Sequence, residues 1–172
     1  MKSSFYLFLI LILSSCNNMT EIEKALQIQD ETKSIIEISE ILSKKAEFSD
    51  NFENLTEAEK TFIFVEMLET EVNNGGFDQF FYNSSGDFTY EVLDGLKKIG
   101  ALRTAKILEE AYAIFPVNPI PKDIEKRRDI LKDVDSKTKE KWNELEDRFY
   151  TYEENIGGLL LKYVNDNLSQ FK

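Results

Sequence analysis

The chain has 172 residues, of which 42% are hydrophobic and 31% are charged, and its formal net charge is −11. This length is enough for one domain that buries roughly two thirds of its unfolded surface, and the balanced composition excludes wholesale disorder. Phenylalanine is abundant (13 residues) whereas glycine (7) and proline (3) are scarce. That balance favours long helices over a turn-rich β-sandwich.

The N-terminus has the pattern of an export signal. Lys2 gives a positive start, residues 5–13 form an unbroken apolar run, and small residues at 14 and 15 precede Cys16. A cysteine at this point resembles the bacterial lipoprotein signal, in which the thiol is lipidated and becomes the new N-terminus. The alternative is an ordinary signal peptide that ends near a cysteine. We expect a lipoprotein held at a membrane of the bacterial cell envelope.

Cleavage before Cys16 would divide the chain into a signal peptide (1–15), a lipidated tether (16–20) and a domain (21–172). Because Lys2 is the only charged residue ahead of Cys16, the mature chain keeps 32 acidic residues and 20 of the 21 basic ones, a net charge of −12. Such a surface repels nucleic acid and anionic lipid head groups and favours basic protein partners. We therefore expect no direct nucleic-acid binding and membrane attachment through the lipid alone.

Apolar residues recur at helical spacing along the domain. Residues 21–48 predict one long helix or two shorter ones, and the capping box of Thr56 and Glu59 starts a helix that ends at residues 73–76. A short helix is expected over 77–82, and the next runs from a cap at Ser85 or Asp87 to Gly100. Two more are expected over 101–115 and 122–131. The last two are separated by a break at Gly157 and Gly158, and the first of them begins at a cap at Asp135 or Ser136. No stretch alternates with the period of a strand. The sequence predicts a single all-α domain of about seven to nine helices.

The available side chains limit the chemistry. The chain has no histidine, and lipidation of Cys16 would consume its only thiol, so the usual general base, nucleophile and metal ligands are missing. No phosphate-binding glycine loop is present. We expect no catalytic residue, no metal site and no cofactor. Carboxylates near residues 69–87, Asp87 above all, leave an exported hydrolase of glycan or peptide bonds as an alternative, while Glu66 and Glu69 have ordinary surface spacing.

One segment differs from the rest of the chain, because two polar turns flank a short aromatic helix between Glu71 and Asp87. In a purely structural interpretation, the glycines end helices and the phenylalanines pack in the core. The polar side chains then form hydrogen bonds with backbone groups that are left unpaired at the two turns. A functional interpretation brings amides and aromatics together on one protein-binding surface. The candidate contact residues are Asn73, Asn74, Gly75, Gly76, Gln79, Phe80, Asn83, Ser84, Gly86 and Asp87.

The same segment resembles a bacterial domain of unknown function that also forms the C-terminal part of a DNA-mimic protein. The resemblance rests on E-V-N-N-G-G-F at 71–77, Q-F-F at 79–81 and N-S-S-G at 83–86, and it extends over residues 55–164. It implies an all-helical domain with no assigned catalytic activity. In the DNA-mimic member it also implies an acidic surface that engages DNA-binding proteins.

The sequence is best interpreted as a non-enzymatic, acidic, lipid-anchored domain that binds an unidentified protein, and its charge favours a basic partner. A second copy of the chain is another partner to consider. The alternatives are the carboxylate-dependent hydrolase and a DNA mimic that sequesters a DNA-binding protein.

The lipoprotein prediction can be tested by replacing Cys16 with serine. Expressed in a bacterium fed an alkyne-labelled fatty acid, the parent should carry the label and sediment with membranes, whereas Cys16→Ser should lose both properties because its hydroxyl is not the thiol that is acylated. The Ser15→Ala variant, which keeps a small residue at the cleavage site, should behave as the parent. A labelled Cys16→Ser protein would show that the anchor lies elsewhere.

Overall fold

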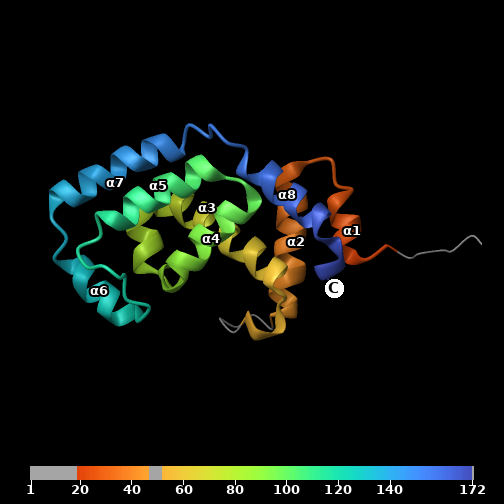
Figure 1. The fold of residues 1–172 in the computed structure, drawn as a ribbon, viewed down its shortest axis with the longest axis horizontal. Coiled ribbons are helices and arrows are strands. Elements are labelled where there is room, and N and C mark those ends of the chain that lie inside the picture. The colour runs from red at the N-terminus through yellow and green to blue at the C-terminus, as the bar shows by residue number, and fades with distance from the viewer. Residues whose placement is uncertain (1–18, 47–51, 172) are drawn as a thin grey trace, which may run out of the picture.

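The computed structural model describes residues 19–46 and 52–171, and within them it contains eight α-helices and no strand (Figure 1). The predicted signal peptide and Cys16 lie outside the described residues. The all-α prediction is confirmed. The helices are α1 (Glu21–Leu26), α2 (Glu31–Lys45), α3 (Glu57–Tyr82), α4 (Thr89–Ile99), α5 (Leu102–Ala113), α6 (Ile124–Lys132), α7 (Ser136–Phe149) and α8 (Ile156–Asp166), with 3₁₀ turns η1 (Phe52–Asn54), η2 (Ser84–Phe88) and η3 (Leu168–Gln170).

Side-chain caps begin most helices. The Thr56 hydroxyl accepts a hydrogen bond from the Glu59 N–H at 3.2 Å, and the Glu59 carboxylate accepts one from the Thr56 N–H at 2.8 Å, which confirms the predicted capping box. Asp135 caps α7 as predicted. Asp30 accepts from the Lys33 N–H, so the N-terminal stretch is two helices instead of one.

Two predicted boundaries are wrong. Gly157 and Gly158 do not break a helix but lie in the first turn of α8, where Asn155 accepts a hydrogen bond from the Gly158 N–H at 2.9 Å. The break falls earlier, in the connection over residues 150–155. Neither Ser85 nor Asp87 caps α4, because both lie in η2 and their side chains are engaged elsewhere.

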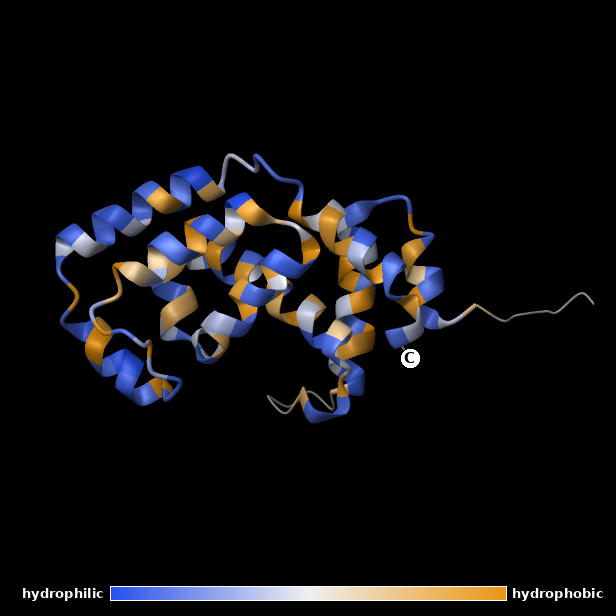
Figure 2. Cartoon of the chain, viewed as in Figure 1, coloured by the Kyte–Doolittle hydropathy of each residue, from blue (hydrophilic) through white to orange (hydrophobic). Residues whose placement is uncertain are grey.

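The longest helix, α3, lies at the centre of the fold and contacts five of the other helices. Its second half supplies Phe77, Phe80 and Phe81, all fully buried, and the Phe81 ring lies 5.4 Å from that of Trp142 on α7. The Trp142 indole N–H donates to the Ala111 carbonyl at 3.0 Å, so the largest buried side chain has no unpaired polar atom. Figure 2 shows hydrophobic residues gathered where the helices face one another and a largely hydrophilic outer side on α7.

Helix α3 is kinked at two glycines in its C-terminal third. Gly76 has φ +71°, a conformation that side chains rarely adopt, and its neighbour Gly75 also leaves helical geometry. A Cβ at Gly76 would lie 2.2 Å from Glu146 Oε1. That carboxylate instead accepts a hydrogen bond from the Phe77 N–H at 2.7 Å. The predicted break is confirmed in position, although the chain makes a sharp bend instead of a loop.

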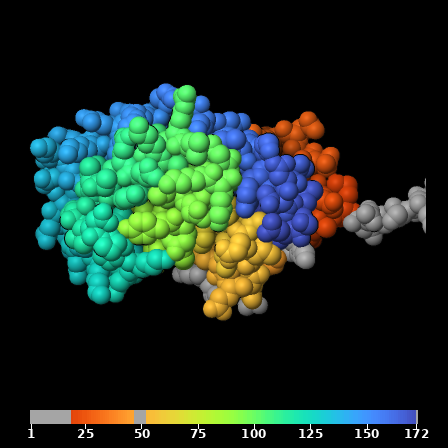
Figure 3. Space-filling view, in the orientation of Figure 1, coloured from red at the N-terminus to blue at the C-terminus, as the bar shows by residue number. Residues whose placement is uncertain are grey.

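The molecule is elongated, with α6 at one end and α1 and the C-terminus at the other (Figures 1 and 3). Gly100, with φ +87°, ends α4 as predicted. None of the described helices is both long enough and apolar enough to cross a bilayer.

A buried arginine attaches α6 to the rest of the fold. Arg127 is fully buried, and its guanidinium contacts five acceptors through four hydrogen bonds and one ion pair. Four are backbone carbonyls, those of Phe81, Asn83, Pro121 and Lys122, at 2.8–3.0 Å. The fifth is the Asp87 carboxylate, at 2.5 Å. The side chain therefore joins the end of α3, η2 and the segment before α6.

Substitution of Arg127 should be far more destabilising than substitution of the neighbouring arginine. Arg127→Met would leave buried carbonyls and Asp87 without a donor, at a cost of about 3–5 kcal/mol in the free energy of unfolding. Arg128→Met should cost under about 1 kcal/mol, because Arg128 is partly exposed and pairs with the exposed Glu125. Urea denaturation of both variants measures the difference. Equal losses would mean that the buried network contributes little.

Candidate functional site

Three polar side chains of the unusual segment converge on the half-buried carboxylate of Glu71. Gln79 Nε2 donates to Glu71 Oε2 at 2.7 Å and Asn83 Nδ2 donates to the same oxygen at 2.9 Å. The Ser85 hydroxyl donates to Glu71 Oε1 at 2.7 Å. This network ties the two halves of the kinked helix to η2, so Gln79 and Asn83 have a structural role in this state.

Three more of the predicted contact residues are interior. Gly76, Phe80 and Gly86 are buried, and a Cβ at Gly86 would lie 2.8 Å from Arg127 Nε and 2.9 Å from the Phe81 carbonyl oxygen. Asp87, the carboxylate considered for hydrolysis, is the ion-pair partner of Arg127. Proton transfer at Asp87 would therefore disturb the network that attaches α6.

The exposed part of the segment lies at the kink itself. Asn73, Asn74 and Gly75 are exposed, and beside them stand two tyrosines from the α7–α8 connection that are 43% and 47% exposed. The Tyr152 hydroxyl donates to Asn73 Oδ1 at 2.9 Å, and the Tyr150 hydroxyl donates to the Val72 carbonyl at 2.7 Å. We call these five residues, Asn73, Asn74, Gly75, Tyr150 and Tyr152, the kink surface. Ser84, the remaining candidate, is half-buried in η2.

A groove adjoins the kink surface. A depression of about 440 Å³ lies between α2, α3 and the start of α8, and Asn73 and Tyr152 form part of its wall. A second depression of about 460 Å³ shares Ile36 and Glu66 with the first and continues along α2. We call the two together the α2–α3 groove.

Three carboxylates face the first depression, those of Glu31, Glu66 and Glu69. Burial raises the pKa of Glu69 from its usual 4.5 to about 7, with a further contribution from the negative charges of Glu66 and Glu31. Burial also raises the pKa of Glu66, although its hydrogen bond from Thr70 opposes the shift. In the described part of the chain no lysine or arginine forms an ion pair with any of the three carboxylates.

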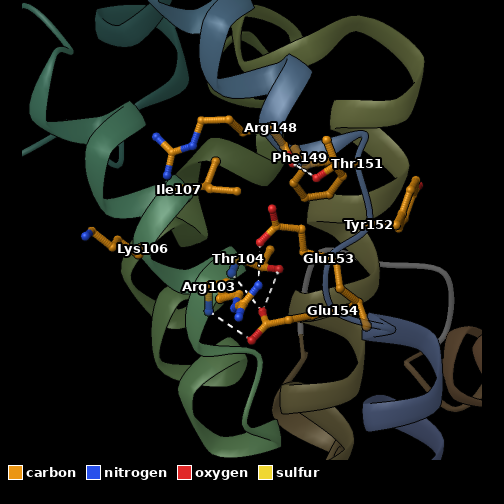
Figure 4. Close-up of a pocket in the computed structure, with 11 residues that line it drawn as sticks. Arg103, Thr104, Lys106, Ile107, Arg148, Phe149, Thr151, Tyr152, Glu153 and Glu154 are labelled. Carbon is orange, nitrogen blue, oxygen red and sulfur yellow. Dashed lines mark hydrogen bonds and ion pairs between the residues drawn. The ribbon is translucent and has the colours of Figure 1, made fainter.

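A smaller pocket of about 170 Å³ lies between α5 and the α7–α8 connection (Figure 4). Most of its polar groups already have partners. Glu154 accepts hydrogen bonds from the backbone N–H groups of Arg103 and Thr104 at 3.0 and 2.9 Å, and so caps α5. Arg103 pairs with Glu153 at 2.5 Å. These contacts hold the α7–α8 connection against α5, and this connection carries the tyrosines of the kink surface.

Over residues 19–46 and 52–171, no group of three or more acidic or cysteine side chains has the geometry to hold a metal ion. Sequence reasoning missed the acidic groove because its carboxylates come from two distant helices. The spacing of Glu66 and Glu69 is typical of a solvated face, and only the packing of α2 against α3 brings Glu31 to them. Glu71 belonged to the unusual segment, but its role as a common acceptor required the kink.

The raised pKa of Glu69 predicts a pH-dependent gain in stability for the Glu69→Gln variant. The unfolded chain ionises this group near pH 4.5 and the folded protein near 7, so the native state loses stability as the pH rises between these values. Glutamine removes that penalty. The variant should match the parent at pH 4 and exceed its free energy of unfolding at pH 8 by about 1–3 kcal/mol. Urea titrations at both pH values check it, with Glu109→Gln as control.

Comparison with known protein families identifies a relationship. Residues 53–167 fit the family model described as DMP19-like protein. No curated protein and no solved structure matches the chain. The matched residues include α3, its kink and the Glu71 and Arg127 networks, and they leave out α1 and α2. Because the match covers more than half of the chain, the protein has a DNA-mimic-like domain and belongs to the DMP19-like family.

Proposed function

We propose that the domain is a non-enzymatic recognition module that binds a protein partner through the kink surface and the groove beside it. The observation that carries the proposal is the contrast within the unusual segment. Most of its polar groups are bonded internally, whereas Asn73, Asn74 and Gly75 are exposed next to two exposed tyrosines. Tyrosine and asparagine offer large contact area and adaptable hydrogen bonds, as in many protein-binding surfaces.

Charge supports a basic partner. The full chain has 32 acidic and 21 basic residues, and the depression next to the kink surface is lined by three carboxylates and no lysine or arginine. Complementary charge accelerates association and disfavours wrong partners. The same charge opposes contact with nucleic acid.

The proposed location is the bacterial cell envelope, with the domain tethered by a lipid on Cys16. Its support is the sequence pattern around the cysteine, namely a charged start, a short apolar run and small residues before the thiol. The proposed partner is then a protein that is accessible from the envelope membrane.

A second candidate function is DNA mimicry, which family membership favours. A DNA mimic would present a dense row of negative charges to a DNA-binding protein. The discriminating experiment is competition. If the protein displaced duplex DNA from a basic regulator in a salt-sensitive manner and were present in the cytosolic fraction, mimicry would replace the envelope proposal.

Affinity capture tests the recognition surface. Residues 17–172, which include every described residue, serve as bait in envelope and soluble extracts beside an Asn74→Ala/Tyr152→Asn variant. Asparagine tolerates the positive φ of Tyr152. We expect a partner that the parent retains and that the variant binds at least about tenfold more weakly, a loss of about 1.4 kcal/mol.

The control is Tyr82→Asn, because Tyr82 is as exposed as Tyr152 but lies outside the kink surface. It should retain the partner at the parental level, and both variants should melt cooperatively. A partner that the double variant holds as tightly as the parent would remove the kink surface from the proposal.

A further inference from the structure

We propose that the α2–α3 groove binds a lysine- or arginine-bearing segment of a protein, with its basic side chains at the carboxylates and its apolar side chains against α2. This inference rests on the proposed function and adds the location and the chemistry of the contact. It differs from the acidic surface expected of the family, because one wall of the groove is α2, which lies outside the matched residues 53–167.

The shape of the groove suits a chain segment. Two depressions of about 440 and 460 Å³ share Ile36 and Glu66, so they form one elongated channel along α2. Ile36 is 52% exposed within it, which is unusual for an isoleucine without a covering partner. A channel of this kind holds several consecutive side chains, as grooves for peptide segments do.

The charge of the groove specifies a basic occupant. Glu31, Glu66 and Glu69 face the first depression, and Glu40 faces the second, where Lys44 lies 3.9 Å from it. The groove therefore carries four carboxylates and one base. Several acids elsewhere on the surface are closely paired, for example Glu109 with Lys97 at 2.6 Å. Glu66 and Glu69 are half-buried and have no ion-pair partner, so an incoming ammonium or guanidinium group would stabilise them.

Other occupants fit less well. The described side chains offer no arrangement suited to a metal ion, and a bare cation would leave the exposed isoleucine uncovered. A second copy of the chain would bring another net charge of −11 against the same carboxylates. A basic segment with apolar residues satisfies both the charge and the exposed apolar surface.

Binding should be coupled to loss of a proton. Glu69 faces Glu66 on its own helix, Glu31 on α2 and the phenol of Tyr152 across the depression, and Glu40 and Lys44 lie farther along the groove. With its pKa at about 7, Glu69 is largely protonated at pH 6 and must ionise to pair with a base. Lysine and arginine stay charged throughout this range. Affinity should therefore rise between pH 6 and pH 8.

The test uses residues 17–172 and a synthetic amphipathic peptide, acetyl-LKKLLKKLLKKL-amide, followed by ¹H–¹⁵N spectra and calorimetry. We expect shifts at Ile35, Ile36, Glu66, Glu69 and Asn73, and a weaker effect from the analogue in which every lysine is glutamate. Glu66→Gln/Glu69→Gln should weaken binding at least tenfold and remove the pH dependence. The variant should fold, since it removes buried charge.

The matched control is Glu109→Gln/Glu110→Gln, which removes the same charge from α5, outside the groove. If both double variants weakened binding equally, the attraction would be non-specific and the inference would be wrong. Shifts confined to other surfaces, or self-association that Glu66→Gln/Glu69→Gln abolishes, would also overturn it. The two proposals fail separately. If the kink surface captured an envelope protein but the peptide did not bind in the groove, only this inference would be wrong. If the peptide bound in the groove but capture did not depend on the kink surface, only the earlier proposal would be wrong.

Discussion

The kink at Gly75 and Gly76 is the constraint on which the rest of the structure depends. A straight helix would carry the aromatic half of α3 away from α7 and would leave no room for the Glu146 carboxylate, which occupies the space that a Cβ on Gly76 would fill. The bend brings Phe81 against Trp142, with Phe77 stacked on Phe81, and places Gln79 and Asn83 within reach of Glu71. One backbone irregularity thus determines both the aromatic packing of the core and the hydrogen bonds to Glu71.

The helices could be predicted because their signals are local. The capping box at Thr56 and Glu59, the cap at Asp135 and the stop at Gly100 act within one turn, and all three are confirmed. The predicted helix break at Gly157 and Gly158 was wrong because glycine is also tolerated in the first turn of a helix, where Asn155 provides the cap. Which polar groups of the unusual segment face inward was not predictable, since their acceptors depend on tertiary packing.

The acidic groove illustrates how a site arises between segments that are each unremarkable alone. Glu66 and Glu69 on α3 have the spacing of a solvated face, and Glu31 begins an ordinary helix. Packing α2 against α3 brings the exposed Glu31 close to the half-buried Glu66 and Glu69, and none of the three has an ion-pair partner within the described residues. Partial burial of neighbouring carboxylates, which raises the pKa of both Glu66 and Glu69, distinguishes the groove from the general acidity of the chain.

The arrangement around Arg127 has a consequence for how the molecule opens. Its acceptors lie on the end of α3, on η2 and on the segment before α6, and one side chain satisfies all of them. None of these segments can separate from the others without stranding buried carbonyls, so they form one cooperative unit in sub-global unfolding. The α6 end of the molecule is therefore expected to exchange its amide hydrogens as a block, independently of the opposite end, where α1, α2 and α8 meet.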